Sequence, residues 1–187
     1  MTDEALLVLE EAEEHMQKAI MHLEHEFSKI RAGKASPQML HGIKVEFYGV
    51  PTPIEQTANI NTPDPRQIIV QPFDKSTIHE IEKAIINANL GFNPSNEGEI
   101  IRINVPPLTE ERRVSLVKQA KHAVEESKIG IRNARHKANN EAKQLEKDGM
   151  EEDEVKRLLD EIQKLTDKYV KKVDELFEIK EKDIMTV

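Results

Sequence analysis

The chain of 187 residues contains no cysteine and no tryptophan. The absence of cysteine excludes disulfide frameworks, thiolate zinc sites and cysteine nucleophiles, and it is compatible with a reducing compartment. Aromatic residues make up only 4% of the chain, with two Tyr and five Phe. This is too few for a base-stacking platform or an aromatic-rich β-sandwich. The composition therefore favours a protein built from long, solvated helices.

Long hydrophobic runs are also missing. No apolar stretch approaches the roughly 18 residues of a membrane-spanning helix, and Met1-Thr2-Asp3-Glu4 lacks the basic start of a signal peptide. We therefore expect a soluble, cytoplasmic protein without a membrane partner. Hydrophobic residues still make up 37% of the chain, and their regular spacing predicts a folded core rather than disorder.

Proline and glycine are unevenly distributed along the chain. All nine prolines and five of the seven glycines lie between residues 33 and 107. Because proline costs about 3 kcal/mol inside a helix, this distribution separates two helical flanks from an irregular middle. We expect a helical bundle formed by residues 1–30 and 106–187, an inserted domain at 31–105, and hinges near 31–37 and 104–107.

The flanks carry apolar residues at helical spacing. The second of these helices, from about residue 109 to 147, is rich in small residues, which favours close approach of its neighbours. Gly149 is expected to end it. Three such helices bury their apolar faces most simply as an elongated three-helix bundle. The stripes are Met16, Ile20, Leu23, Phe27 and Ile30; Val117, Ala120, Val124, Ser127, Ile131, Ala134, Ala138, Ala142 and Leu145; and Val155, Leu158, Ile162, Leu165, Tyr169, Val173 and Leu176.

The middle segment has a different pattern of apolar residues. Residues 43–49, 66–70 and 100–105 resemble β-strands, and residues 76–90 place isoleucines at helical spacing before Gly91. The predicted fold class is therefore α+β, with a small β/α/β domain inserted into the bundle. The chain connects the bundle and the inserted domain twice. Because both connections are rich in glycine and proline, they permit a hinge that moves in a limited number of directions.

The formal net charge of -8 argues against a nucleic-acid partner, but the charge is not evenly spread. Residues 1–26 carry eight acidic groups and one basic group, whereas residues 112–143 carry nine basic and three acidic groups. On a helix, the cations of this second segment fall within an arc of about 100° that only Glu125 interrupts. They are Lys118, Lys121, Lys128, Arg132, Arg135, His136 and Lys143.

A line of cations along one helix suits a phosphate backbone, because each neutralised phosphate releases counterions. The alternative interpretation is a solvated flank whose cations pair with acidic residues on the neighbouring helices. Composition alone does not separate the two.

Motifs for enzymatic chemistry are missing. The chain has no GxGxxG or GxxxxGK loop, no nucleophile elbow around its serines, and no carboxylate pair in an apolar setting. His15, His22 and His25 lie on the first helix, where a weak metal site is an alternative to ordinary surface histidines. We therefore predict no enzyme activity, no metal and no cofactor.

Several segments resemble those of bacterial ribosome recycling factors. Residues 106–113 are similar to the family's PPLTEERR segment, and residues 31–37 to its Arg-x-Gly-(Arg/Lys)-Ala-Ser-Pro pattern. Residues 45–49 resemble its Val-x-(Tyr/Phe)-Tyr-Gly pattern, and residues 82–85 and 90–94 match its EKAI and LGxNP segments. These segments occur in the family's order over essentially the whole chain, so the resemblance is specific.

The resemblance implies an L-shaped, two-domain protein with a flexible hinge. It implies that the protein, together with elongation factor G and GTP hydrolysis by that partner, splits the post-termination ribosome into subunits. The bundle would bind rRNA of the large subunit near the intersubunit bridges, and the translocase would push the small domain. No additional apolar stripe is left over, so we expect a monomer.

The resemblance also indicates site residues. The segment 132–136 is similar to the arginine-bearing segment of the family, although many relatives have Arg and Asp where this chain has His136 and Lys137. The residues expected to contact rRNA are Arg132, Arg135, Lys121, Lys128, Lys118 and His136. The residues expected at the hinge, or elbow, are Arg31, Gly33, Lys34, Pro37, Pro106, Pro107, Arg112 and Arg113.

Two other functions compete with this hypothesis. A helical adaptor or chaperone-like protein would explain the helices and the net acidity, but neither the localised basic arc nor the series of motifs. A metal-dependent enzyme built on His15, His22 and His25 is the third alternative.

Overall fold

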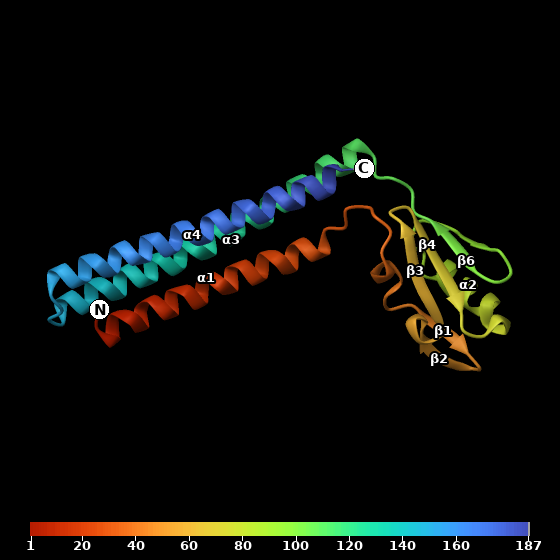
Figure 1. Cartoon of the computed structure of the whole chain (residues 1–187), viewed down its shortest axis with the longest axis horizontal. Helices are drawn as coiled ribbons and strands as arrows, with labels where there is room; N and C mark the ends of the chain where they lie inside the picture. The colour runs from red at the N-terminus through yellow and green to blue at the C-terminus, as the bar shows by residue number, and fades with distance from the viewer. Residues whose placement is uncertain (187) are drawn as a thin grey trace. The chain divides into compact units, whose positions relative to one another are not determined.

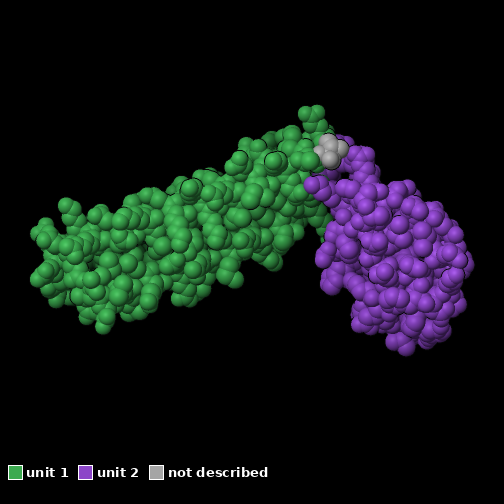
Figure 2. All heavy atoms as spheres, in the orientation of Figure 1, with its two compact units in different colours: residues 1–32, 110–187 green, residues 33–109 purple. Residues whose placement is uncertain are grey.

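The computed structural model describes residues 1–186, which form two compact units (Figures 1 and 2). Unit 1 combines residues 1–32 with the chain from residue 110 onward, and unit 2 comprises residues 33–109. The chain therefore crosses between the units at 32–33 and at 109–110. The sequence-based boundaries at 30–31 and 105–106 lie about two and four residues earlier.

Unit 1 contains three long helices that lie side by side: α1 (Asp3–Lys29), α3 (Glu110–Lys147) and α4 (Glu152–Met185) (Figure 1). The backbone N–H of Thr2 donates to a carboxylate oxygen of Glu154, so α1 and α4 start at the same end and run parallel. Helix α3 is antiparallel to both and spans about 57 Å at 1.5 Å per residue. No helix within residues 1–186 has the length and apolar character needed to cross a bilayer.

The helix ends follow from local sequence. Thr2 caps α1, its hydroxyl oxygen accepting from the backbone N–H of Ala5 at 3.3 Å. Gly149 adopts φ +109°, and the following N–H of Met150 donates to the carbonyl oxygen of Leu145. Glycine reaches this backbone conformation without a Cβ clash, so the predicted break between the second and third helices is confirmed.

The buried face of each helix is wider than the predicted stripe. All five stripe residues of the first flank are buried. Four predicted core residues are only half-buried, because each helix contacts two neighbours and a single stripe cannot face both. These four are Val117, Leu145, Leu165 and Leu176, and the buried residues outside the predicted stripes are Ala5, Val8, Ala12, Leu116, Ala123, Thr166 and Ile184.

Helices α1 and α3 approach closely where α3 carries its small residues. The hydroxyl of Ser127 donates to the carbonyl oxygen of Ala19 at 3.0 Å. A Cβ placed on Gly130 would lie 3.4 Å from the Cβ of Ala19. Glycine costs about 1 kcal/mol inside a helix relative to alanine, and the added Cβ would be in ordinary van der Waals contact with α1.

Unit 2 contains a four-stranded antiparallel sheet in the order β3-β4-β6-β5 and a separate hairpin, β1-β2. Helix α2 (Ile78–Asn87) buries Ile78, Ile81 and Ile85 in the same core as the strands. The strands are β1 (Lys44–Phe47), β2 (Val50–Pro53), β3 (Ala58–Asp64), β4 (Gln67–Pro72), β5 (Pro94–Asn96) and β6 (Ile101–Asn104). Short 3-10 turns are η1 (Pro37–Leu40), η2 (Ile54–Gln56) and η3 (Lys75–Thr77).

The α+β fold class is confirmed, but the sequence predicted only three of the six strands. The missed strands are β2, β3 and β5, and each contains proline. Proline cannot donate to a ladder and is confined to sheet edges and bulges. Strands β3 and β5 are the two edges of their sheet, and the β3 register shifts between Asn61 and Asp64, around Pro63.

The β1-β2 turn is tied to the end of β4 by a side-chain hydrogen bond. Tyr48, at φ +50°, donates its hydroxyl to the carboxylate of Asp74. The Ser76 hydroxyl and backbone N–H donate to the same carboxylate. The hydrogen bond from Tyr48, followed by those from Ser76, holds the pKa of Asp74 below its ordinary value, and the carboxylate raises the pKa of Tyr48.

Replacing this phenol tests the cause of the pKa shift. In the Tyr48→Phe variant we expect the pKa of Asp74 to rise toward its ordinary value, while Ser76 retains part of the shift. A depressed carboxyl pKa stabilises the fold above the unfolded-state pKa, and this contribution is lost as pH falls through the folded-state pKa. The variant should therefore lose less stability on acidification. An NMR titration of the Asp74 carboxyl carbon measures the shift, and an unchanged pKa would contradict this assignment.

Candidate nucleic-acid interface

Helix α3 buries one side against α1 and α4 and presents its cations on another. The small residues Ala120, Ala134 and Ala138 lie in the core. Lys118, Lys121, Arg132, His136 and Lys143 are exposed, while Lys128 and Arg135 are half-buried. The predicted basic arc is therefore accessible along the length of α3. We call these seven residues the α3 basic face.

Lys128 differs from its neighbours on this face. Its ammonium lies 2.8 Å from the carboxylate of Asp174 on α4, and its side chain is only 20% exposed. The carboxylate offsets the charge of Lys128. The alternative interpretation, in which cations of this helix pair with acidic residues of the neighbouring helices, therefore holds for Lys128. Its predicted role in phosphate binding is weakened accordingly.

The remaining strong cations of the face have no such partner. Within the described residues 1–186, Arg132, Arg135, Lys118 and Lys121 form no ion pair. The acidic helices on either side thus leave these charges available. Unpaired guanidinium and ammonium groups along an exposed helix face are suited to phosphate oxygens.

Two exposed apolar side chains lie on or beside the same face. Val114 is 45% exposed and Ile129 is 52% exposed. At 100° per residue, Val114 falls inside the basic arc and Ile129 at its margin. Sequence reasoning passed over both, because it used apolar residues only to locate the core. The sequence feature that could have identified both residues is their position outside the apolar stripe of their own helix.

The histidines of α1 do not gather into a metal centre. Nδ1 of His15 lies 2.8 Å from the carbonyl oxygen of Glu11. His22 faces Glu126 of α3 at 3.9 Å, and His122 faces the same carboxylate at 3.2 Å. Nowhere in residues 1–186 do three or more His, Asp or Glu side chains lie close enough to hold a metal ion.

The residues predicted for the hinge lie beside the two chain crossings. Arg31 follows the end of α1, and Arg112 and Arg113 lie in the first turns of α3. The other predicted hinge residues lie at the two ends of unit 2. At the first end Pro37 starts η1, and at the second end two exposed prolines separate β6 from α3. These hinge residues of unit 2 are Gly33, Lys34, Pro37, Pro106 and Pro107.

Both ends of unit 2 are fastened to one turn, the β3-β4 turn. The backbone N–H of Ala35 donates to the carbonyl oxygen of Pro65, and that of Val105 donates to Arg66, both at 2.7 Å. Gly33 adopts φ +71°, and a Cβ added there would overlap the side chain of Leu108. The entering and leaving segments therefore lie against each other within unit 2. Composition and spacing do not predict these two hydrogen bonds, because they depend on tertiary structure.

Comparison of the chain with known protein families shows which family has this combination of bundle and small domain. Residues 23–185 match the family described as ribosome recycling factor. The chain belongs to the ribosome recycling factor family. A ribosome-recycling factor of Flavobacterium johnsoniae is 54% identical over 187 residues, covering 100% of both chains. That of Clostridioides difficile is 53% identical over 183 residues, covering 97% of this chain and 99% of the relative.

Two solved structures of ribosome recycling factors also resemble the chain. A solution structure of a ribosome recycling factor has a TM-score of 0.71 and 42% identity, with 100% coverage of both chains. A second has a TM-score of 0.60 and 44% identity, again with 100% coverage of both. It is described as models for the T. thermophilus ribosome recycling factor and E. coli elongation factor G bound to the E. coli post-termination complex. The family predicted from the sequence motifs is confirmed.

The contact between Gly33 and Leu108 gives a test of the unit 2 ends. Gly33→Ala introduces both a left-handed alanine, at about 1–2 kcal/mol, and an overlap with Leu108, at about 1–3 kcal/mol. Gly98→Ala is the matched control, because Gly98 has φ +89° but nothing within 4 Å of an added Cβ. We expect Gly33→Ala to destabilise unit 2 more than the control does.

Hydrogen exchange of the buried β4 amides of Ile68 and Val70 measures the effect on unit 2 directly. Equal destabilisation by the two substitutions would show that Leu108 does not confine Gly33.

Proposed function

We propose that this protein acts as a ribosome recycling factor. It binds the post-termination ribosome through its helical bundle and, with elongation factor G and GTP hydrolysis by that partner, splits it into subunits. The mRNA and tRNA are then released for a new round of translation. Support comes from relatives of that name aligned over the full chain and from a solved relative that is described, with elongation factor G, as bound to the post-termination complex. The observation in this chain that carries the proposal is the set of unpaired cations on α3.

The α3 basic face binds rRNA of the large subunit near the intersubunit bridges. Arg132 and Arg135 make charge-assisted hydrogen bonds to phosphate oxygens, and Lys121 and Lys118 add point charges along the same line. His136 and Lys128 lie on the face as lesser contributors, since Asp174 already neutralises Lys128. Contacts to phosphates are independent of base sequence, so the binding recognises RNA shape.

The acidic remainder of the chain limits binding to this one face. Residues 1–26 and 144–187 carry excess negative charge, which repels phosphate at distances within the Debye length of about 8–10 Å. A net acidic protein with one basic helix therefore avoids coating RNA at random. The charge distribution supports a single orientation on the ribosome.

The two chain crossings transmit movement of unit 2 to the clamped bundle. Gly33 and Lys34 on one crossing, and Pro106 and Pro107 on the other, act as the hinge, and Arg31, Arg112 and Arg113 support it from the bundle. Pro37 lies beyond the Ala35 anchor, where it starts η1. Because the β3-β4 turn fastens both ends of unit 2, the movement is confined to the few residues between the anchors and the helices. Elongation factor G drives unit 2, and the bundle delivers the force to the bridge region.

In this account the protein is a cytoplasmic, monomeric, non-enzymatic factor. The chemical step, GTP hydrolysis, belongs to the translocase, and the recycling factor needs no metal or cofactor of its own. Its contribution is binding energy on α3 and mechanical coupling through the hinge.

Large-subunit binding at several salt concentrations tests the α3 basic face. We expect Arg132→Ala and Arg135→Ala each to weaken binding by about tenfold, as for the loss of a charged hydrogen bond. Each should also reduce the magnitude of the slope of log affinity against log salt by about one. Arg157→Ala is the matched control, because Arg157 is an exposed arginine on α4 outside the face.

Binding to sedimented large subunits across a salt series gives both quantities. Unchanged affinity and an unchanged salt slope in both variants would contradict the proposed contact.

A further inference from the structure

Two prolines determine which way the backbone of the β1-β2 hairpin faces. In the register of this hairpin, Lys44 is opposite Pro53 and Glu46 is opposite Pro51. Antiparallel pairs alternate between those that exchange two hydrogen bonds and those that exchange none. Proline has no N–H, so both proline pairs are of the second kind. The N–H and C=O groups of Lys44 and Glu46 therefore point away from β2.

The two outer edges of this hairpin are consequently unequal. Along β2, Pro51 and Pro53 remove the N–H groups that a further strand would need, which is a common way to block an edge. Along β1, both Lys44 and Glu46 offer a donor and an acceptor. No strand within residues 1–186 other than β2 pairs with β1. The hairpin thus presents one blocked edge and one open edge.

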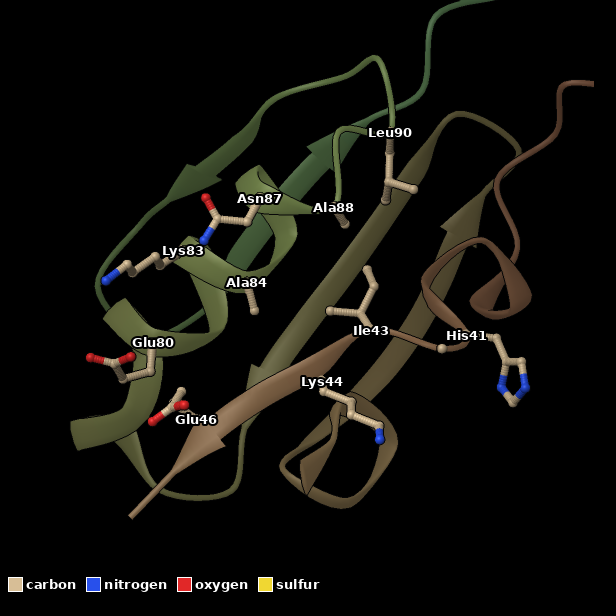
Figure 3. Close-up of a pocket in the computed structure, with 11 residues that line it drawn as sticks. His41, Ile43, Lys44, Glu46, Glu80, Lys83, Ala84, Asn87, Ala88 and Leu90 are labelled. Carbon is tan, nitrogen blue, oxygen red and sulfur yellow. The ribbon is translucent and has the colours of Figure 1, made fainter. Parts of the chain in front are cut away.

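The open edge borders a groove. A cavity of about 510 Å³ lies between β1 and helix α2 (Figure 3). Ile43, Ala84 and Leu90 point into the space between the strand and the helix (Figure 3), and all three pack on the core of unit 2. The groove therefore combines an apolar floor with a wall of free backbone hydrogen-bonding groups.

Unpaired charges surround this groove. Glu46 of β1 and Glu80 of α2 lie near each other at one end, and Lys83 lies farther along the helix (Figure 3). Within residues 1–186 none of these three, nor Lys44, forms an ion pair. Two neighbouring carboxylates disfavour a phosphate and favour a cationic side chain at that end.

We propose that the groove between β1 and α2 binds an extended segment of a partner protein, which adds to β1 as a strand. Main-chain hydrogen bonds to Lys44 and Glu46 supply the ladder, as in other cases of strand addition. The segment carries an aliphatic side chain toward Ile43, Ala84 and Leu90 and a lysine or arginine beside Glu46 and Glu80. This inference does not depend on rRNA binding by α3, because its residues all belong to unit 2.

Amide hydrogen exchange on the full-length chain tests strand addition directly. In the free protein we expect the amides of Lys44 and Glu46 to exchange faster than those of Val45 and Phe47, which donate to β2. The probe is a blocked six-residue peptide of alternating valine and threonine with one arginine in place of a threonine. At saturation it should slow exchange at Lys44 and Glu46 at least tenfold. The same peptide methylated on alternate backbone nitrogens is the control and should not bind.

A charge reversal tests the acidic end of the groove. Glu80→Lys should weaken peptide binding at least tenfold, whereas Glu99→Lys should not, because Glu99 is an exposed carboxylate of unit 2 that does not line the groove. Native NMR spectra of both variants exclude misfolding as the cause.

Three results would overturn the proposal. The first is no protection of Lys44 and Glu46 at millimolar peptide, and the second is equal binding of the methylated peptide. The third is protection that rises with protein concentration in the absence of peptide, which would assign the edge to a second copy of this chain.

Discussion

The close packing of α3 against α1 decides which side of α3 faces solvent. Ser127 donates a hydrogen bond to Ala19 across this interface, and a Cβ added to Gly130 would touch Ala19, so side chains much larger than these would force the helices apart. With the small residues buried, Arg132 and Arg135 have only the outer surface left to them. The position of the α3 basic face is thus a consequence of core packing, and its proposed binding of phosphate relies on the four cations that form no ion pair within residues 1–186.

A second constraint acts at the ends of unit 2. The carbonyl groups of Pro65 and Arg66 accept hydrogen bonds from the entering and leaving segments, and Gly33 lies against Leu108. Anchoring both segments at one turn leaves few residues free to change conformation between unit 2 and the helices. The hinge proposed at these crossings is therefore limited in its directions of movement.

Helical periodicity and proline placement were sufficient to predict the three long helices and the fold class. They did not predict β2, β3 or β5, because prolines such as Pro51 and Pro63 are tolerated at edges that only the assembled sheet defines. The helical wheel placed Lys128 on the basic arc and left open whether it is paired, and in the structure Asp174 of the neighbouring helix pairs with it. Such pairings depend on tertiary contacts that spacing within one helix does not reveal. The roles expected of residues such as Arg132 and Gly33 come from the family resemblance, because periodicity alone does not indicate function.

The central claim is that α3 holds the ribosome while elongation factor G acts on the rest of the molecule. Light scattering of post-termination ribosomes measures subunit splitting most directly, with the wild type compared to a double variant, Arg132→Ala with Arg135→Ala. We expect the wild type to split ribosomes only when elongation factor G and GTP are present, and the folded double variant to lose most of this activity. Splitting at the wild-type rate by the double variant would contradict the central claim.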